Sequence, residues 1–357
     1  MAEFGSSRLI NALYRRSVDR TPIWLMRQAG RYLPEYRQVR AEAGSFLNLC
    51  KTPELACQVT LQPLNRFALD GAIIFSDILV IPDAMGLDLF FEEDRGPGFF
   101  NPVRTLKDIE NLPIPDPQES LGYVLDAIRL SVAELNNRVP LIGFCGSPWT
   151  VATYMVEGKA SNNHSVIKAM LYDAPHLCHA LLEKITEASI LYLKAQIQSG
   201  AKIAMVFDTW GGILSSRAYF SFSLAYMKKI VQALKEDKAF QQVPIILFTK
   251  NGGQWIEEIA QTGCECVGID WTHDIQKTRA LVGHKVAIQG NLDPCVLYAN
   301  PNKIREEVKQ VLEDFGMGPG HVFNLGHGLH PDMAVPHVEA LVQAVIELSP
   351  NFHTKEA

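Results

Sequence analysis

The amino-acid sequence predicts an α/β fold built as a single (β/α)8 barrel. Its 357 residues are 47% hydrophobic, which is enough to bury a large core. Short apolar runs of the kind that form buried strands recur eight times, and helix-like segments separate the later runs. Eight strand–helix units of this kind describe parallel strands enclosed by a ring of helices.

The eight apolar runs are mostly too short and too continuous to be exposed helices. We expect strands at residues 23–26, 72–75, 140–144, 203–207, 243–248, 266–269, 285–288 and 321–323. Segments with apolar residues near i, i+3 and i+4 spacing predict amphipathic helices at residues 254–262, 275–282, 304–315 and 336–348. Between the second and third strands, residues 86–103 predict a hairpin around Gly96, Pro97 and Gly98.

The structural alternative is a doubly wound open sheet. Such sheets usually bind nucleotides through G-x-G-x-x-G or G-x-x-x-x-G-K-[ST] loops, and neither pattern follows any predicted strand. The chain also contains no internal repeat, low-complexity tract or Gly/Ser linker, which favours one barrel domain over residues 8–357. Residues 1–7 are expected to be a disordered lead-in.

Charge and cysteine content limit the partners and the compartment. The net charge is −6 and no Lys/Arg-rich run occurs, so we expect no binding to nucleic acid or to a membrane surface. The seven cysteines form no C-x-x-C pair, which favours free thiols in a reducing cytoplasm. The start of the chain lacks the apolar segment of a signal peptide, and three aspartates interrupt the apolar stretch 72–91.

Polar and glycine-rich motifs follow each predicted strand, where barrel enzymes build their active sites. Two of them carry charged side chains that are candidates for a site. Arg27 and Arg31 stand four residues apart after the first run, and guanidinium groups bind carboxylates through paired hydrogen bonds. Asp77 follows the apolar run AIIFS, so its carboxylate is expected deep at the mouth of the barrel. Alone, the arginines would more often be surface residues, and Asp77 is as often a helix cap or ion-pair partner.

Residues 21–37 (TPIWLMRQAGRYLPEYR) and 141–159 (LIGFCGSPWTVATYMVEGK) resemble the two signature segments of the uroporphyrinogen decarboxylase family. The similarity runs nearly end to end, through FSDIL, PIPDP, FDTWGG, QGNLDP and FNLGHG. Each short motif would be weak by itself, but their shared order and spacing are highly specific. The resemblance implies a distorted (β/α)8 barrel with its site at the carboxyl ends of the strands.

The resemblance also implies an activity. It points to a cytoplasmic carboxy-lyase that removes CO2 from the four acetate side chains of uroporphyrinogen III and gives coproporphyrinogen III in porphyrin and heme biosynthesis. It further implies a homodimer that needs no cofactor and no metal. Protonation of a pyrrole carbon beside the acetate provides the electron sink that a coenzyme would otherwise supply.

Residue roles follow from matching positions in the family. Asp77 would hold the inward pyrrole N–H groups, and Arg27 would bind carboxylate first and donate a proton second, because guanidinium, with a pKa above about 12, is a poor acid. Phe207 would form a pocket wall. Tyr154, Thr209 and His327 would orient the carboxylate arms, although each alone is more often structural. The catalytic pair is Asp77 and Arg27, and the substrate-binding set is Arg27, Gln28, Ala29, Gly30, Arg31, Asp77, Tyr154, Phe207, Thr209 and His327.

Three rival functions are weighed against this one. Methyltransferases of related fold use a zinc-bound thiol and need Cys or His ligands at the strand ends, yet no cysteine stands beside His327 in the sequence. A tetrapyrrole carrier would need arginines and an apolar cleft but no carboxylate under the ring. A Schiff-base aldolase would use Lys250, to which the family resemblance gives no such role.

Overall fold

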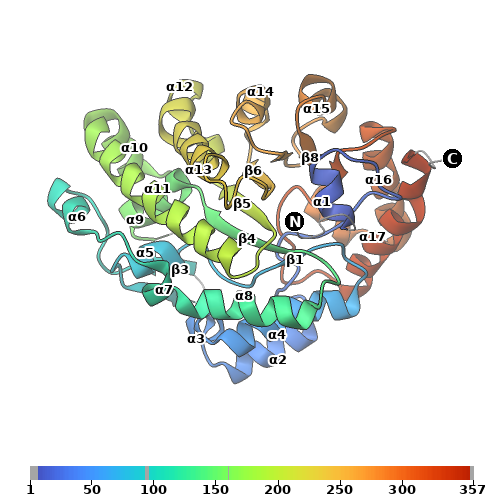
Figure 1. Ribbon diagram of the computed structural model, residues 1–357, viewed down its shortest axis with the longest axis horizontal. Helices are drawn as coiled ribbons and strands as arrows, with labels where there is room; N and C mark the ends of the chain where they lie inside the picture. Colours follow the sequence, from blue (N-terminus) through green and yellow to red (C-terminus); the bar gives the residue numbers. More distant parts are fainter. Residues whose placement is uncertain (1–6, 93–95, 160, 354–357) are drawn as a thin grey trace.

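Seven parallel strands form one curled sheet at the centre of the molecule. The computed structural model describes residues 7–92, 96–159 and 161–353. Figure 1 shows the strands in the middle with most helices packed around their outer side. The strand order is β1-β4-β5-β6-β7-β8-β9, with bounds β1 Ala72–Ile73, β4 Leu141–Gly146, β5 Ile203–Asp208, β6 Ile245–Thr249, β7 Cys266–Gly268, β8 Ala287–Gln289 and β9 His321–Val322.

The sheet forms because its strands are buried on both faces. All six residues of β4 and all five of β6 are buried, which is why these strands read as continuous apolar runs rather than alternating ones. The pairing of β4 with β5 is regular, with Ile142 opposite Ile203 and Gly146 opposite Phe207. Parallel pairing in this register puts the carboxyl ends of successive strands at one edge, as the sequence predicted for seven of the eight runs.

The prediction of a strand at residues 23–26 is wrong. Only Ile23 pairs there, through a single parallel bridge to Phe323. Side-chain oxygens occupy the backbone N–H groups that a strand would use in its ladder. The N–H of Ile23 donates to Asp70 Oδ2 at 2.9 Å, that of Leu25 to Gln28 Oε1 at 3.1 Å, and that of Met26 to Asn324 Oδ1 at 3.0 Å.

Helices occupy most of the remaining chain, and three of the four predicted ones are confirmed within three residues at either end. The predicted segment 254–262 is instead a 3-10 turn followed by a shorter helix. The α-helices are α1 Arg8–Leu13, α2 Pro34–Glu42, α3 Phe46–Lys51, α4 Pro53–Arg66, α5 Val80–Ala84, α6 Leu106–Asn111, α7 Pro117–Ser120, α8 Gly122–Leu135, α9 Pro148–Glu157, α10 Ser165–Asp173, α11 Pro175–Gln198, α12 Ser216–Tyr219, α13 Ala225–Lys235, α14 Ile256–Ala260, α15 Ile275–Val282, α16 Pro301–Phe315 and α17 Val335–Leu348. Short 3-10 segments are η1 Gly211–Ile213, η3 Gly253–Trp255, η4 Pro294–Tyr298 and η5 Ser349–Phe352, and η2 Phe220–Leu224 is a π-helical turn.

The predicted hairpin is present, but its turn lies elsewhere. Strands β2 Leu89–Glu92 and β3 Gly96–Phe99 pair antiparallel, with Phe90 opposite Gly98. The three residues predicted as the turn, Gly96, Pro97 and Gly98, therefore belong to the second strand. The connection falls at residues 93–95, outside the described residues. A bond from Phe99 N to Gly158 O at 2.8 Å attaches the hairpin to the end of α9.

Three further expectations concern the cysteines, membrane-spanning helices and the start of the chain. All seven cysteines are free thiols, as predicted, and only Cys295 is exposed. Within the described ranges, no helix is long and apolar enough to cross a membrane. The predicted lead-in, residues 1–7, lies outside the described residues except for Ser7, whose hydroxyl caps α1 by accepting the N–H of Ile10 at 3.4 Å.

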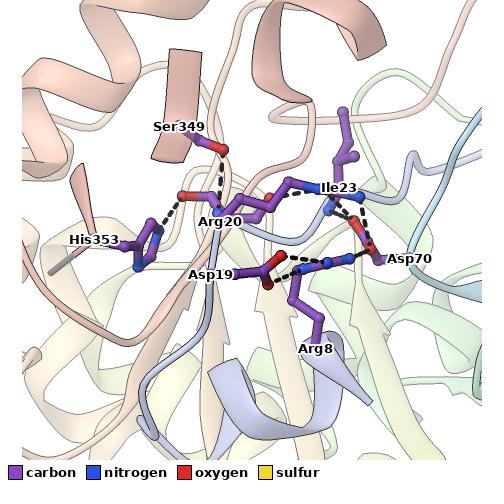
Figure 2. A network of polar contacts seen from close by, with 8 residues as sticks. Arg8, Asp19, Arg20, Ile23, Asp70, Ser349 and His353 are labelled. Atoms are coloured by element: carbon purple, nitrogen blue, oxygen red, sulfur yellow. Dashed lines mark hydrogen bonds and ion pairs between the residues drawn. The ribbon is translucent and has the colours of Figure 1, made fainter. Parts of the chain in front are cut away.

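A buried carboxylate joins the start of the chain to the sheet (Figure 2). Asp70 accepts hydrogen bonds from Arg8 Nη1 at 2.5 Å, from Arg20 Nη1 at 2.8 Å and from the N–H of Ile23 at 2.9 Å. Asp19 pairs with the other side of the Arg8 guanidinium, which raises the pKa of Arg8 and lowers that of Asp19. Because Asp70 lies directly before β1, this cluster fixes the segment that leads to Arg27.

We predict that Asp70→Asn lowers the free energy of unfolding by about 3 kcal/mol, because it leaves Arg8 and Arg20 partly buried without this counter-charge. Urea denaturation followed by circular dichroism measures the change. The control is Asp19→Asn, whose carboxylate is 69% exposed and should cost less than about 1 kcal/mol. Equal losses in the two variants would contradict the central role of Asp70.

Candidate active site

Arg27 lies in the turn that follows the Ile23 bridge and is exposed. Its backbone is in the left-handed region, with φ of 60°. The aliphatic part of its side chain lies against Gly328, where a Cβ atom would come within 2.4 Å of Arg27 Cδ. The arginine therefore reaches across the loop that follows β9, and a side chain at position 328 would displace it.

Asp77 follows β1 and is partly exposed. Its Oδ1 accepts the backbone N–H of Leu79 at 2.8 Å, just before α5. Burial raises the pKa of Asp77, while the Leu79 bond and the charge of Arg27 act in the opposite direction. The Leu79 bond agrees with the cap-like interpretation. Oδ2 has no hydrogen-bond partner within the described part of the chain, and the site interpretation stays a prediction.

Tyr154 is on α9, on the same side of the sheet as Asp77. Ser147, directly after β4, starts this helix by accepting the N–H of Thr150 at 3.0 Å. Burial raises the pKa of Tyr154; the negative charge of Asp77 adds to the rise and the positive charge of Arg27 reduces it. The Trp210 indole N–H lies beside the Tyr154 hydroxyl without meeting hydrogen-bond geometry. Tyr154 is thus close enough to feel both predicted catalytic charges.

His327 stands in the loop after β9 and is partly exposed. Burial lowers its pKa to about 3, and the positive charges of Arg27 and Lys250 lower it further. Its ring centroid lies 6.2 Å from that of Phe248 at the end of β6. At neutral pH, His327 is therefore a neutral hydrogen-bonding group rather than a cation.

An aromatic wall lines the same rim. Phe207, partly exposed near the end of β5, meets Phe144 edge-on at 5.5 Å and Phe248 at 6.3 Å between ring centroids. Phe144 and Phe248 are buried, which leaves Phe207 as the ring that faces outward. Trp149 is fully buried and donates from Nε1 to the Trp210 carbonyl at 3.0 Å, as expected of a packing residue.

A buried carboxylate, Asp208, organises the loops beneath this wall. Its Oδ1 accepts the hydroxyls of Ser147 at 2.5 Å and Thr150 at 3.0 Å, and its Oδ2 accepts those of Ser223 at 2.7 Å and Thr249 at 3.2 Å. Burial raises the pKa of Asp208, and the four hydroxyl bonds oppose the rise. With all its strong acceptor positions used internally, Asp208 is a structural member of the site.

The remaining predicted residues are placed less centrally. Gln28 is buried; its amide accepts from Leu25 N and donates to the Gly71 carbonyl at 3.1 Å, so its side chain is committed to the fold. Ala29, Gly30 and Thr209 are partly exposed, and Arg31 is fully exposed. In the described ranges, no contact joins Arg31 to Asp77, Tyr154 or His327.

Two residues near the rim were not assigned to the site from the sequence. Lys250, after β6, lies with its Nζ 5.8 Å from the Trp271 ring centroid, and its charge acts on His327. Asp270, after β7, accepts from Asn251 N, from Thr272 and from His273; these bonds outweigh burial and lower its pKa to about 2. Lys250 lies in the TKNGG motif and Asp270 in the DW motif, so the sequence draws attention to both. Their closeness to His327 becomes visible only in the folded chain.

The described residues contain no group of three or more His, Cys, Asp or Glu placed to hold a metal ion. The charged groups that act on His327 are instead the cations Arg27 and Lys250 and the anion Asp270. These surroundings suit a ligand with several carboxylates better than the Cys/His ligand set that the methyltransferase interpretation requires.

Comparisons with known proteins identify the family to which the chain is similar. The model of the family described as uroporphyrinogen decarboxylase (URO-D) matches residues 5–348. A uroporphyrinogen decarboxylase of Alkalilimnicola ehrlichii is 58% identical over 357 residues, which is 100% of this chain and 98% of that protein. One of Nitrosococcus oceani is 57% identical over 356 residues and covers 100% of both chains.

Among solved structures, a methyltransferase from Methanosarcina mazei has a TM-score of 0.79 at 23% identity, covering 95% of this chain and 97% of its own. At that identity the likeness shows the shared fold alone. It agrees with the parallel sheet and surrounding helices described above.

We predict that the ring of His327 stays neutral from pH 7 to pH 5 in the folded protein. Its folded pKa lies below the unfolded value near 6.5, so acid protonates His327 only in the unfolded chain, and its contribution to stability falls as the pH drops from about 6.5 towards 3. Its Cε1–H NMR signal, assigned by comparison with His327→Gln, should not shift in this range. The urea-unfolded protein is the control, and a folded-state midpoint near 6.5 would contradict the prediction.

Proposed function

The chain belongs to the uroporphyrinogen decarboxylase family, and we propose that Asp77 and Arg27 are the groups with which it carries out the family's reaction. In that reaction the four acetate side chains of uroporphyrinogen III lose CO2 and become methyl groups, giving coproporphyrinogen III in porphyrin and heme biosynthesis. The observation that carries the assignment is the partly exposed carboxylate of Asp77 at the carboxyl end of the sheet. One of its oxygens has no hydrogen-bond partner among the described residues, and the positive charge of Arg27 acts on it.

Each decarboxylation exchanges CO2 for a proton. A proton first adds to the ring carbon next to the one that bears the acetate arm, which spreads positive charge over the ring nitrogen and the carbon that bears the arm. The electron pair of the bond to CO2 then moves into the ring as CO2 departs, and a proton delivered to the exocyclic carbon completes the methyl group as the ring proton is lost. The barrier depends on stabilising the cationic ring, so a fixed negative charge beneath it lowers that barrier.

Asp77 supplies that charge in the proposed mechanism. Its Oδ2 would accept pyrrole N–H groups, which converge towards the centre of the macrocycle. Because burial raises the pKa of Asp77, the carboxylate is poorly solvated in the free protein. It therefore gains more from a nearby positive ring than a fully hydrated carboxylate would.

Arg27 would bind the carboxylate of the reacting arm, with proton donation as its second role. Its guanidinium is exposed and lies in electrostatic reach of Asp77, Tyr154 and His327. Arg31 and the backbone N–H groups of Ala29 and Gly30 would hold further carboxylates at the outer edge. We assign Gln28 to holding this turn in place, because its side chain bonds Leu25 and Gly71.

The polar residues across the rim would orient the other arms. Tyr154, Thr209 and neutral His327 can each donate a hydrogen bond to a carboxylate, and Phe207 offers the flat apolar surface against which a pyrrole ring packs. These groups supply binding and electrostatics from the chain's own residues, and we propose that the reaction proceeds without a cofactor or metal.

The segment before Arg27 bears on the shape of the site. We infer that residues 22–24 stand in the eighth position of a barrel, between β9 and the start of β1. This is supported by the bond from Phe323 N to Pro22 O at 2.8 Å and by that from Asp70 N to Ile23 O at 2.7 Å. In that position the segment would deliver Arg27 to the same rim as Asp77 and His327.

The assembly and location of the enzyme rest on the family resemblance and on composition. We propose a homodimer in the cytoplasm, the latter in keeping with seven free thiols. Size-exclusion chromatography with light scattering tests the dimer, and a mass equal to one chain would overturn it.

We predict that the purified, dialysed protein converts uroporphyrinogen III stepwise into products with seven, six, five and four carboxylates, with no metal or coenzyme added. Anaerobic incubation, oxidation to porphyrins and chromatography by carboxylate number measure the conversion. A parallel incubation with a chelator should give the same rate. Unchanged substrate would contradict the proposed function, and chelator-sensitive turnover would contradict only its independence of metal.

We predict that Asp77→Ala abolishes turnover and that Asp77→Asn, which keeps the shape but loses the charge, lowers kcat by about 100-fold or more. Because burial disfavours the charged form of Asp77, Asp77→Asn should unfold at the same temperature as the parent or higher. The matched control is Asp83→Asn. Asp83 lies within α5, and its carboxylate pairs with Lys51 at 2.7 Å. Near-normal turnover in Asp77→Asn with intact folding would remove the central claim.

A further inference from the structure

A cavity of about 300 Å³ opens at the end of the sheet opposite the decarboxylation site. Val286 and Gly320, which line it, directly precede β8 and β9, so the cavity faces the amino-terminal ends of these strands. No residue of the proposed active site contributes to it. Its wall combines two guanidinium groups with an apolar surface, in a set that includes Tyr14, Arg15, Arg279, Val286, Ile288 and Phe315.

Among the described residues, no carboxylate offsets the charge of these two arginines. In the described part of the chain neither Arg15 nor Arg279 forms an ion pair, whereas Arg8, Arg66 and Arg305 each pair with an acidic side chain. The residues lining the cavity include no aspartate or glutamate. The local charge is therefore positive in a chain whose net charge is −6.

Backbone carbonyls position these guanidinium groups without neutralising them. Arg15 Nη1 donates to the carbonyls of Gly283, at 3.2 Å, and His284. Arg279 donates from Nη1 to Phe315 O and from Nη2 to Met317 O. A guanidinium has five N–H donors, so Arg15 Nε and Nη2 stay available to a ligand. Both side chains are held in one orientation, which lowers the entropic cost of binding.

The surrounding chain is shaped to admit the arginines. Gly318 and Gly320 have φ of 111° and 92°, which favours glycine. A Cβ atom at Gly318 would lie 3.2 Å from Arg279 Nη2, and one at Gly320 would lie 3.2 Å from Arg15 Cγ. Phe315 forms a rigid floor, with the Arg279 guanidinium carbon 4.4 Å from its ring centroid and the His321 ring stacked at 4.2 Å. Burial of Arg279 without a counter-charge lowers its pKa, so its charged form is incompletely solvated.

We propose that this cavity is a second ligand site that binds a small multivalent oxyanion, such as phosphate or a di- or tricarboxylate, between Arg15 and Arg279. Guanidinium groups recognise phosphate and carboxylate oxygens through paired, charge-assisted hydrogen bonds. The volume is at the lower end of small-molecule pockets, which suits a compact anion rather than a tetrapyrrole.

The test is calorimetric titration of the full chain with inorganic phosphate and, separately, with citrate, at ionic strength fixed by sodium chloride. The two titrations distinguish an inorganic from an organic source of the same chemistry. We expect one site per chain for at least one of them, with affinity reduced roughly tenfold or more in Arg15→Gln. Arg279→Gln should weaken binding to a similar extent, but this variant also removes the bonds to Phe315 and Met317. The result for the exposed Arg15 therefore decides the test.

Two variants control for charge and for place. Arg16→Gln removes the same charge one residue away, where the side chain lies over the Tyr14 ring outside the cavity lining, and should bind within about twofold of the parent. Arg27→Gln alters the decarboxylation rim and should bind equally well at the opposite end. The proposal would be overturned if phosphate and citrate bound no more tightly than chloride. It would also be overturned if Arg16→Gln lost as much affinity as Arg15→Gln, or if Arg27→Gln lost affinity and Arg15→Gln did not. Decarboxylation measured on Arg15→Gln should be unchanged, which separates failure at this site from failure of the proposed function.

Discussion

The buried Asp208 carboxylate is the interaction on which the architecture of the rim depends. An ionised group enclosed in a protein is costly unless hydrogen bonds replace its hydration, and Asp208 receives four from side-chain hydroxyls. Those donors come from the loop after β4, from α9, from η2 and from the end of β6. Each hydroxyl satisfies the carboxyl group only at one position, so three separate parts of the chain, the start of α9, η2 and the end of β6, are held in register by a single side chain.

The groups proposed to meet substrate are attached to this frame. Ser147 bonds Asp208 and also begins α9, the helix that carries Tyr154. Thr150 donates to Asp208 and accepts the backbone N–H of Trp210 at 3.1 Å, which fixes the turn containing Thr209. Thr249, which also donates to Asp208, directly precedes Lys250. The arms of the substrate would thus be oriented by residues whose own positions derive from one buried anion, rather than by independent loops.

The sequence predicts this fold well where burial decides the structure and poorly where long-range side-chain bonds decide it. Strands β4 to β9 are covered on both faces, so their apolar runs indicate them directly. The run at residues 23–26 has the same composition, yet its N–H groups bond Asp70, Gln28 and Asn324, and two of these partners lie 47 and 298 residues from their donors. Composition cannot reveal such partners. The candidate site divides likewise: motif order predicts Arg27, Asp77 and His327 as its members, whereas the Asp208 network and the neighbours of Lys250 appear only once the strands are adjacent.

The distribution of charge on the rim answers two opposed demands of the proposed reaction. The substrate arrives as a polyanion, which requires cations, and it reacts through a cationic ring, which requires an anion. Arg27 is exposed and Lys250 partly exposed, and His327 is kept neutral by burial and by their charges. Asp77 stands apart, bonded to Leu79 and incompletely solvated. Cations would bind the carboxylates through the whole reaction, whereas the attraction of Asp77 for the ring becomes strong only when the ring is protonated. Only the attraction of Asp77 for the ring differs between ground state and transition state. In this mechanism Asp77 therefore raises kcat, whereas the arginines strengthen substrate binding.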